Sequence, residues 1–234
     1  MARFSFLAPH DGVHSGRGRG HAAAVLGLGR FGEAVALELM AEGAEVLGVD
    51  NNPSVIQRLD GQLTVVATAD VTDAEVLNQL SVPELDRVVL GISSDIAASI
   101  LTASQLIRSN VEQIWAAAAT DQHGLILEQI GVHHVVYPEQ DMGKRVAHLV
   151  RGSLLEYIRV GDDFAVAETV PPASVTGAPL DPARIEALYG VRVIARRTGT
   201  GPWEFTGAGS VISAQDRILV AGPPDMTDAF SQLT

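Results

Sequence analysis

The sequence predicts an α/β protein in which a doubly wound parallel sheet is followed by a small α+β domain. Short apolar runs alternate with helical patterns between residues 22 and 138, and this alternation is typical of βαβ units. A glycine-rich turn follows the first apolar run, and the pattern of the chain changes after Gly161. These observations together predict two folded domains.

Six apolar runs are expected to form the parallel strands. They lie at 22–27, 45–50, 63–67, 87–92, 113–118 and 134–138, and helical patterns lie near 31–40, 53–60, 73–80, 95–108 and 121–130. Parallel strands need crossover connections of this kind, so helices should cover both faces of the sheet. The first domain is therefore predicted over residues 21–138, after a mobile tail at 1–20 that shows no sustained hydrophobic period.

A longer helix is predicted over residues 139–160. Apolar residues recur there at spacings of three and four, Pro138 suits a helix start, and Gly161 suits a stop. The helix packs either on its own sheet or against a second subunit, and the sequence favours neither. Residues 161–234 are expected to form a small α+β domain with strands near 163–170, 191–197, 202–205 and 216–222 and a helix near 181–188.

The composition excludes several classes of function. The chain of 234 residues carries 28 acidic and 16 basic residues, and the resulting charge of −12 argues against a nucleic-acid partner. The absence of cysteine excludes disulfides and thiolate catalysis. No apolar run reaches the roughly 18 residues that a membrane-spanning helix needs, so we expect a cytoplasmic protein. Residues 162–234 contain neither histidine nor lysine, which argues against an enzyme.

The segment GLGRFG at residues 27–32 directly follows an apolar strand and opens an amphipathic helix. In such a turn Gly27 permits the tight bend, Gly29 lets the backbone approach a pyrophosphate, and Gly32 allows close packing of helix and strand. Asp50 ends the next strand, where a carboxylate accepts hydrogen bonds from ribose hydroxyls and opposes a 2′-phosphate. The pattern predicts a Rossmann-like nucleotide site.

Further polar side chains are expected around this turn. Arg30 occupies an exposed position from which it can bind phosphate of its own ligand or of a neighbouring subunit's ligand. Asp70 and Ser93 follow later strands and should face the crevice where open α/β sheets bind ligands. Glu139, at a predicted helix start, either complements the helix dipole or binds a cation. The predicted site also includes Phe31, Asn51 and Asn52.

Four segments carry a resemblance to a known family: VLGLGRFGEAVALELMAEGAEVLGVDNNP, GISSDIAAS, VVYPEQDMGKRVAHLV and EYIRVGDDFAVAE. From about residue 21 to 225 the chain resembles the RCK-domain regulatory subunits of Trk/Ktr-type bacterial potassium uptake systems. The resemblance implies Rossmann-like halves that pair through a crossover helix. It also implies a homo-oligomer, from a dimer to an octameric ring, beneath a membrane-embedded potassium-translocating subunit.

The resemblance also implies ligands and residue roles. ATP or ADP, and in some relatives NAD or NADH, would bind in the crevice, with Asp50 on the ribose and Asn52 on the adenosine. Arg30 matches the arginine that senses the terminal phosphate across the dimer interface. Glu139 matches an acid that binds a divalent cation, Mg or Ca, or Na between protomers.

The expected function is therefore a non-enzymatic regulatory subunit, peripheral to the inner face of the membrane through its partner. It would gate potassium transport through an ATP/ADP-dependent change of the ring. The alternatives are an NAD(H)-binding redox sensor and an NAD-dependent dehydrogenase, for which the glycine turn and Asp50 would serve equally well.

Overall fold

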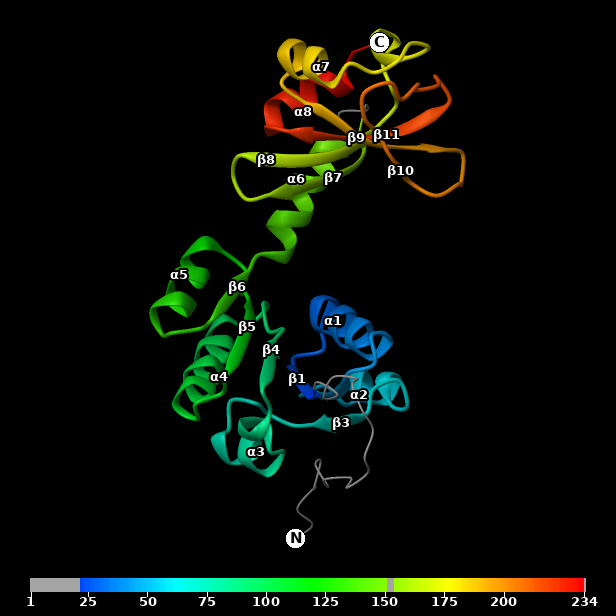
Figure 1. Ribbon diagram of the computed structural model, residues 1–234. Coiled ribbons are helices and arrows are strands. Elements are labelled where there is room, and N and C mark those ends of the chain that lie inside the picture. The colour runs from blue at the N-terminus through cyan, green and yellow to red at the C-terminus, as the bar shows by residue number, and fades with distance from the viewer. Residues whose placement is uncertain (1–21, 151–153, 234) are drawn as a thin grey trace, which may run out of the picture. The chain divides into compact units, whose positions relative to one another are not determined.

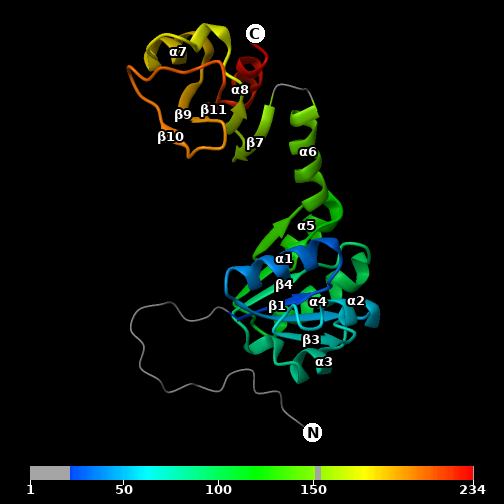
Figure 2. The same ribbon diagram turned by 90° about the vertical axis from the view of Figure 1, so that its right-hand side faces the viewer.

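The structure is a computed structural model that describes residues 22–150 and 154–233 (Figures 1 and 2). The tail predicted at 1–20 lies outside these residues. The chain divides into two compact units, with the boundary between Glu139 and Gln140. Within the described ranges the longest helices have 13 residues, and no helix combines the length and apolar character needed to cross a bilayer.

The first unit contains a six-stranded parallel sheet in the order β3-β2-β1-β4-β5-β6. Its strands are β1 (Ala22–Leu26), β2 (Glu45–Asp50), β3 (Val65–Thr68), β4 (Arg87–Leu90), β5 (Gln113–Ala117) and β6 (His134–Val136). The chain winds outward from β1 to β3 and then returns to β4 on the other side of β1. This order confirms the predicted Rossmann-like doubly wound fold and places a topological switch point between β1 and β4.

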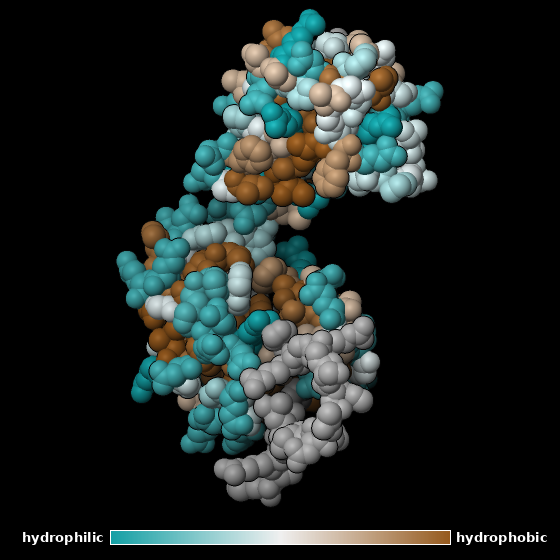
Figure 3. Space-filling view, viewed as in Figure 1, coloured by the Kyte–Doolittle hydropathy of each residue, from teal (hydrophilic) through white to brown (hydrophobic). Residues whose placement is uncertain are grey.

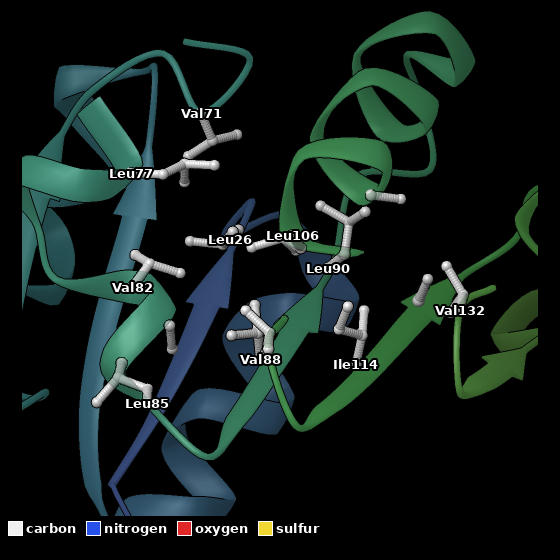
Figure 4. Close-up of a cluster of buried hydrophobic side chains, with 14 of the residues drawn as sticks. Leu26, Val71, Leu77, Val82, Leu85, Val88, Leu90, Leu106, Ile114 and Val132 are labelled. Atoms are coloured by element: carbon white, nitrogen blue, oxygen red, sulfur yellow. The ribbon is translucent and has the colours of Figure 1, made fainter. Parts of the chain in front are cut away.

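Helices cover both faces of this sheet. They are α1 (Arg30–Ala41), α2 (Pro53–Leu59), α3 (Ala74–Gln79), α4 (Ile96–Arg108) and α5 (Asp121–Gln129), with a 3₁₀ turn at Val82–Glu84. The strands are apolar on both faces: Leu26 and Leu106 belong to one buried cluster, and neighbouring Val25 belongs to a second cluster with Ala36 of α1 (Figure 4). This two-sided burial is the reason the strands read as continuous apolar runs rather than as alternating ones.

The predicted helix over 139–160 is wrong in its second half. Helix α6 spans Pro138–Val150, and β7 spans Leu154–Val160. The register of β7 shifts between Leu154 and Glu156, which is the signature of a bulge. The additional residue puts Leu154 and Tyr157 on the same buried face although they lie three positions apart. The bulge therefore gives this strand apolar residues at a three-residue spacing, which is also typical of a helix.

The second unit contains a five-stranded antiparallel sheet in the order β10-β9-β11-β8-β7. Its other elements are β8 (Phe164–Thr169), β9 (Arg192–Thr198), β10 (Glu204–Phe205), β11 (Asp216–Gly222), α7 (Pro182–Tyr189), α8 (Pro224–Ser231) and a 3₁₀ turn at Ala173–Val175. Helix α8 is absent from the predicted elements. Its Phe230 is buried and meets the ring of Tyr189 edge-on, with the ring centroids 5.4 Å apart. The second unit confirms the predicted α+β class.

Exposed apolar side chains gather on the second unit. The space-filling view shows a brown area over β7 and β8, where Ile158, Val160 and Phe164 are exposed (Figure 3). Met142, Val146 and Val150 of α6 are also exposed. A single chain thus leaves the apolar stripe of α6 uncovered.

Candidate nucleotide-binding site

A cavity of about 420 Å³ lies at the carboxyl edge of the parallel sheet. The segments that follow β1, β2, β3 and β4 line it, together with the first turns of α1 and α4. Of the predicted site residues, those in the lining are Gly27, Gly29, Arg30, Phe31, Asp50, Asn51, Asn52, Asp70, Ser93 and Glu139. Gly32 does not line the cavity and is buried beneath the turn. The cavity occupies the switch point, where open α/β sheets bind their ligands.

The three glycines of the turn meet different constraints. Gly27 has a φ of +88°, and a side chain there would place Cβ 2.7 Å from Ile92 Cγ1. A Cβ on Gly32 would lie 1.9 Å from the carbonyl oxygen of Gly27. Gly29 has an ordinary φ of −65°, and a Cβ there would meet no atom within 4 Å. The fold therefore requires Gly27 and Gly32, whereas Gly29 keeps space open beside the cavity.

The first turn of α1 is available to an anion. Gly29 is its N-cap and provides no side-chain hydrogen bond to the N–H groups of that turn. Such unsatisfied N–H groups, together with the helix dipole, attract phosphate. Glu33, the acid in this turn, is bound to Arg58 of α2 by two hydrogen bonds, and that guanidinium lowers the pKa of its carboxyl. The positive charge of Arg58 thus balances the negative charge of the Glu33 carboxylate, which reduces its repulsion of a phosphate at this helix start.

Asp50 is held in place by the backbone on both sides. Its Oδ2 accepts the N–H of Leu28 at 2.7 Å, and its Oδ1 accepts the N–H of Asn52 at 2.8 Å. Each carboxylate oxygen has further acceptor capacity, so the ribose hydroxyls still have sites to bind. The side-chain oxygen of Asn52 accepts the N–H of Ser54 and caps α2. The predicted adenosine contact of Asn52 would therefore use its NH₂ group.

Asp70 is fixed by Thr72, which is not among the predicted site residues. Its Oδ1 accepts both the N–H and the hydroxyl of Thr72, at 2.9 and 2.7 Å. These hydrogen bonds lower the pKa of Asp70, so it remains an ionised acceptor in the cavity wall. An Asp followed two residues later by Thr is a local signal for such a turn.

Glu139 lies in the cavity lining at the start of α6. Among residues 22–150 and 154–233, no three His, Asp or Glu side chains gather in an arrangement that could hold a metal ion. One subunit's described residues therefore do not assemble the cation site that was predicted around Glu139, and that site stays a prediction.

The lining contains polar groups that can bind a nucleotide. Of the described residues that form it, none is histidine, lysine or tyrosine. Its ionisable groups are carboxylates and the guanidinium of Arg30, which is always protonated. The arrangement provides hydrogen-bond acceptors for a sugar and donors for phosphate.

Comparisons with known proteins identify relatives of this chain. Residues 23–138 match the family model of the TrkA-N domain. The chain is 34% identical over 200 residues to Ktr system potassium uptake protein C of Bacillus subtilis (strain 168), covering 85% of this chain and 90% of that protein. It is 32% identical over 203 residues to Ktr system potassium uptake protein A of Vibrio alginolyticus, covering 86% and 92%.

Solved structures share the fold at lower identity. The crystal structure of the GsuK RCK domain superposes with a TM-score of 0.61 at 20% identity, covering 97% of this chain and 48% of that chain. The GsuK channel bound to NAD superposes with a TM-score of 0.62 at 20% identity, covering 97% and 40%. This chain thus spans less than half the length of those GsuK chains. The sequence relatives confirm the predicted resemblance, and the chain belongs to the family of the Ktr system potassium uptake proteins.

Proposed function

We propose that this protein is a nucleotide-binding regulatory subunit that acts on the cytoplasmic side of a membrane-embedded potassium transporter and performs no catalysis. Its Ktr relatives are potassium uptake proteins. The observation that carries the proposal is the preset cavity. Asp50 is fixed by two backbone N–H groups, the first turn of α1 has no side-chain cap, and Gly29 leaves space that the fold does not need.

The proposed ligands are ATP and ADP. Phosphate would lie at the start of α1, after β1, and the ribose would lie at Asp50, at the end of β2. The Asp50 carboxylate would repel a 2′-phosphate, which disfavours NADP. NAD and NADH present the same adenosine half, and a channel of the same fold has been solved with NAD. They are therefore the competing ligands.

The proposed switch is the γ-phosphate. Arg30 is exposed at the mouth of the turn and is free to reach a phosphate bound in a neighbouring subunit. ATP changes the shape of the assembly only if it binds one shape more tightly than the other. A tenfold preference supplies about 1.4 kcal/mol per site, and several sites in one ring add their preferences.

We propose that the assembly is a homo-oligomer built from dimers, up to an octameric ring. The exposed stripe of Met142, Val146 and Val150 on α6 supports a second copy as its cover. Glu139 would bind a divalent cation or Na together with groups from the partner protomer or the nucleotide. The Glu139→Gln variant should therefore lose the cation dependence of nucleotide binding while it keeps cation-free binding.

Calorimetry on the purified full chain with ATP, ADP, NAD and NADH, each with and without Mg²⁺ or Ca²⁺, tests the ligand. Particle imaging with ATP and with ADP tests the change in ring shape. Arg30→Ala should abolish the preference for ATP over ADP, whereas Arg108→Ala, which changes an exposed arginine outside the cavity, should keep it.

Equal affinities for ATP and ADP, together with one ring shape in both, would refute gating. Tighter binding of NADH than of ATP would favour the redox sensor, and turnover of NAD with a substrate would favour the dehydrogenase.

A further inference from the structure

A buried histidine lies outside the nucleotide cavity. His123, in the first turn of α5, has only 1% of its surface exposed. Its Nδ1 accepts the backbone N–H of Ala119 at 3.2 Å. A backbone N–H is always a donor, so Nδ1 carries no proton and the neutral ring carries its hydrogen on Nε2. That Nε2–H donates to the hydroxyl of Ser99 on α4, 3.1 Å away.

Ser99 connects this ring to the wall of the cavity. Ser99 is fully buried, and its N–H bonds the carbonyl of Asp95 at 3.0 Å. Asp95 caps α4 by accepting the N–H of Ala98, and both residues line the cavity. A displacement of Ser99 is therefore a displacement of the first turn of α4, which is part of the binding site.

The same helix also contacts the lining segment that follows β3. Thr102, one turn after Ser99, donates its hydroxyl to the carbonyl of Val71 at 3.3 Å, and Gln105 donates to the carbonyl of Thr72 at 2.5 Å. Val71 and Thr72 line the cavity, and Thr72 fixes Asp70. Helix α4 therefore positions two cavity walls and is itself attached to His123.

Protonation of the ring would break this arrangement. A hydrogen on Nδ1 would face the N–H of Ala119, so two donors would meet where one hydrogen bond now exists. The charged and titratable groups on α5, and on or directly beside the elements that pack against it, are Asp95, Arg108, Asp121, Glu128, His133, His134 and Tyr137. The pKa of His123 is lowered by burial alone, so none of these groups offsets the loss of hydration of the imidazolium.

We propose that His123 is a pH-sensitive latch that couples proton binding to nucleotide affinity through α4, an inference that rests on the proposed function. The neutral ring holds the first turn of α4 in the binding conformation. Protonation of the ring opens the latch and lowers nucleotide affinity. By reciprocity, a bound nucleotide makes His123 harder to protonate.

Calorimetric titration with ADP from pH 8 down to the lowest pH at which the chain stays folded tests the latch. Below the pKa of His123 the wild-type affinity should fall by up to about tenfold per pH unit beyond the fall in His123→Gln, because one proton is coupled to binding. Comparison with the variant cancels the ionisation of the ADP phosphate itself. The control His134→Gln, which changes a histidine on the outer strand β6, should follow the wild type. Equal pH dependence in the wild type and His123→Gln would overturn the proposal.

NMR of the imidazole provides an independent readout. The spectrum should show a hydrogen on Nε2 and none on Nδ1, and the amides of Ala98 and Ser99 should shift with the titration of the ring. In Ser99→Ala the ring should still titrate, but the affinity for ADP should no longer depend on its protonation. This variant tests the latch if His123→Gln does not fold. The latch would be refuted by a proton on Nδ1 at pH 8. It would also be refuted if the chemical shifts of the α4 amides did not change as the ring titrates. Absence of ADP binding at pH 8 would instead count against the proposed function.

Discussion

Gly32→Ala should destabilise the first unit severely, although alanine is normally the better helix residue. A glycine-to-alanine change within a helix usually stabilises by about 1 kcal/mol. Here the new Cβ would lie 1.9 Å from the carbonyl oxygen of Gly27, whereas a relaxed carbon–oxygen contact needs about 3.3 Å. The backbone of the turn or of α1 must move by about 1.4 Å, and both are anchored to buried strands. Overpacking against a backbone atom puts the cost at about 3 kcal/mol or more.

Thermal unfolding followed by circular dichroism measures this effect, and a loss of about 3 kcal/mol corresponds to a fall in Tm of about 10 °C for a domain of this size. Gly29→Ala is the matched control in the same turn. Its Cβ meets no protein atom, so only the weaker N-cap preference of alanine applies, at a cost of about 1 kcal/mol or less. Gly29→Ala should nevertheless weaken ATP and ADP binding at least tenfold. A Tm for Gly32→Ala within about 2 °C of the wild type would refute the packing argument.

Three further changes test other parts of the molecule. Asp50→Ala should abolish measurable nucleotide binding by calorimetry and should destabilise the first unit by about 1–3 kcal/mol, because two backbone N–H groups lose their acceptor. Burial opposes ionisation of Asp216, but hydrogen bonds, led by that from the Thr198 hydroxyl, outweigh it and hold the pKa of this carboxyl below its usual range. The stability that results is present above about pH 4 and is lost as the pH falls through the lower folded-state pKa, so acid unfolding of the second unit should move to higher pH in Thr198→Val. Phe230→Ala should lower the free energy of unfolding, measured with denaturant, by about 3–5 kcal/mol, because this side chain of α8 is buried in the core of the second unit.

Local hydrophobic patterns predicted the strands that consist of a single apolar run. Strand β2 has the predicted bounds, because it is a single apolar run in a regular parallel ladder. Strand β11 also has the predicted bounds, although its register against β9 shifts between Leu219 and Val220. Strand β7 was assigned to a helix because its bulge places Leu154 and Tyr157, three positions apart, on one face, and that spacing is also typical of a helix. Helix α8 was missed because Phe230 packs on Tyr189, some forty residues earlier in the chain, and the segment around it has few apolar residues.

Some residues of the candidate site could be predicted from local sequence, and others depend on tertiary contacts. Gly27, Gly32 and Asp50 were found because the spacing of the turn and the end of the next strand are local features of the chain. The hydrogen bonds from Thr72 to Asp70 join residues two positions apart, so the Asp-x-Thr spacing was sufficient to predict them. The role of His123 depends on its hydrogen bond to Ser99, 24 residues earlier on α4, and a local pattern carries no information about such a contact.

The charge of the cavity links the nucleotide to the predicted cation. Among the described residues, the lining holds four carboxylates, of Asp50, Asp70, Asp95 and Glu139, against the one guanidinium of Arg30. A triphosphate entering this cavity adds further negative charge, which the N-terminus of α1 offsets only near the phosphates, since its effect falls off within one turn. A cation bound between Glu139 and the phosphates would remove most of the remaining repulsion, and it would do so more for ATP than for ADP or NAD. The proposed cation and the proposed preference for ATP are therefore one hypothesis rather than two, because a bound ion would set how much more tightly the more highly charged ligand binds.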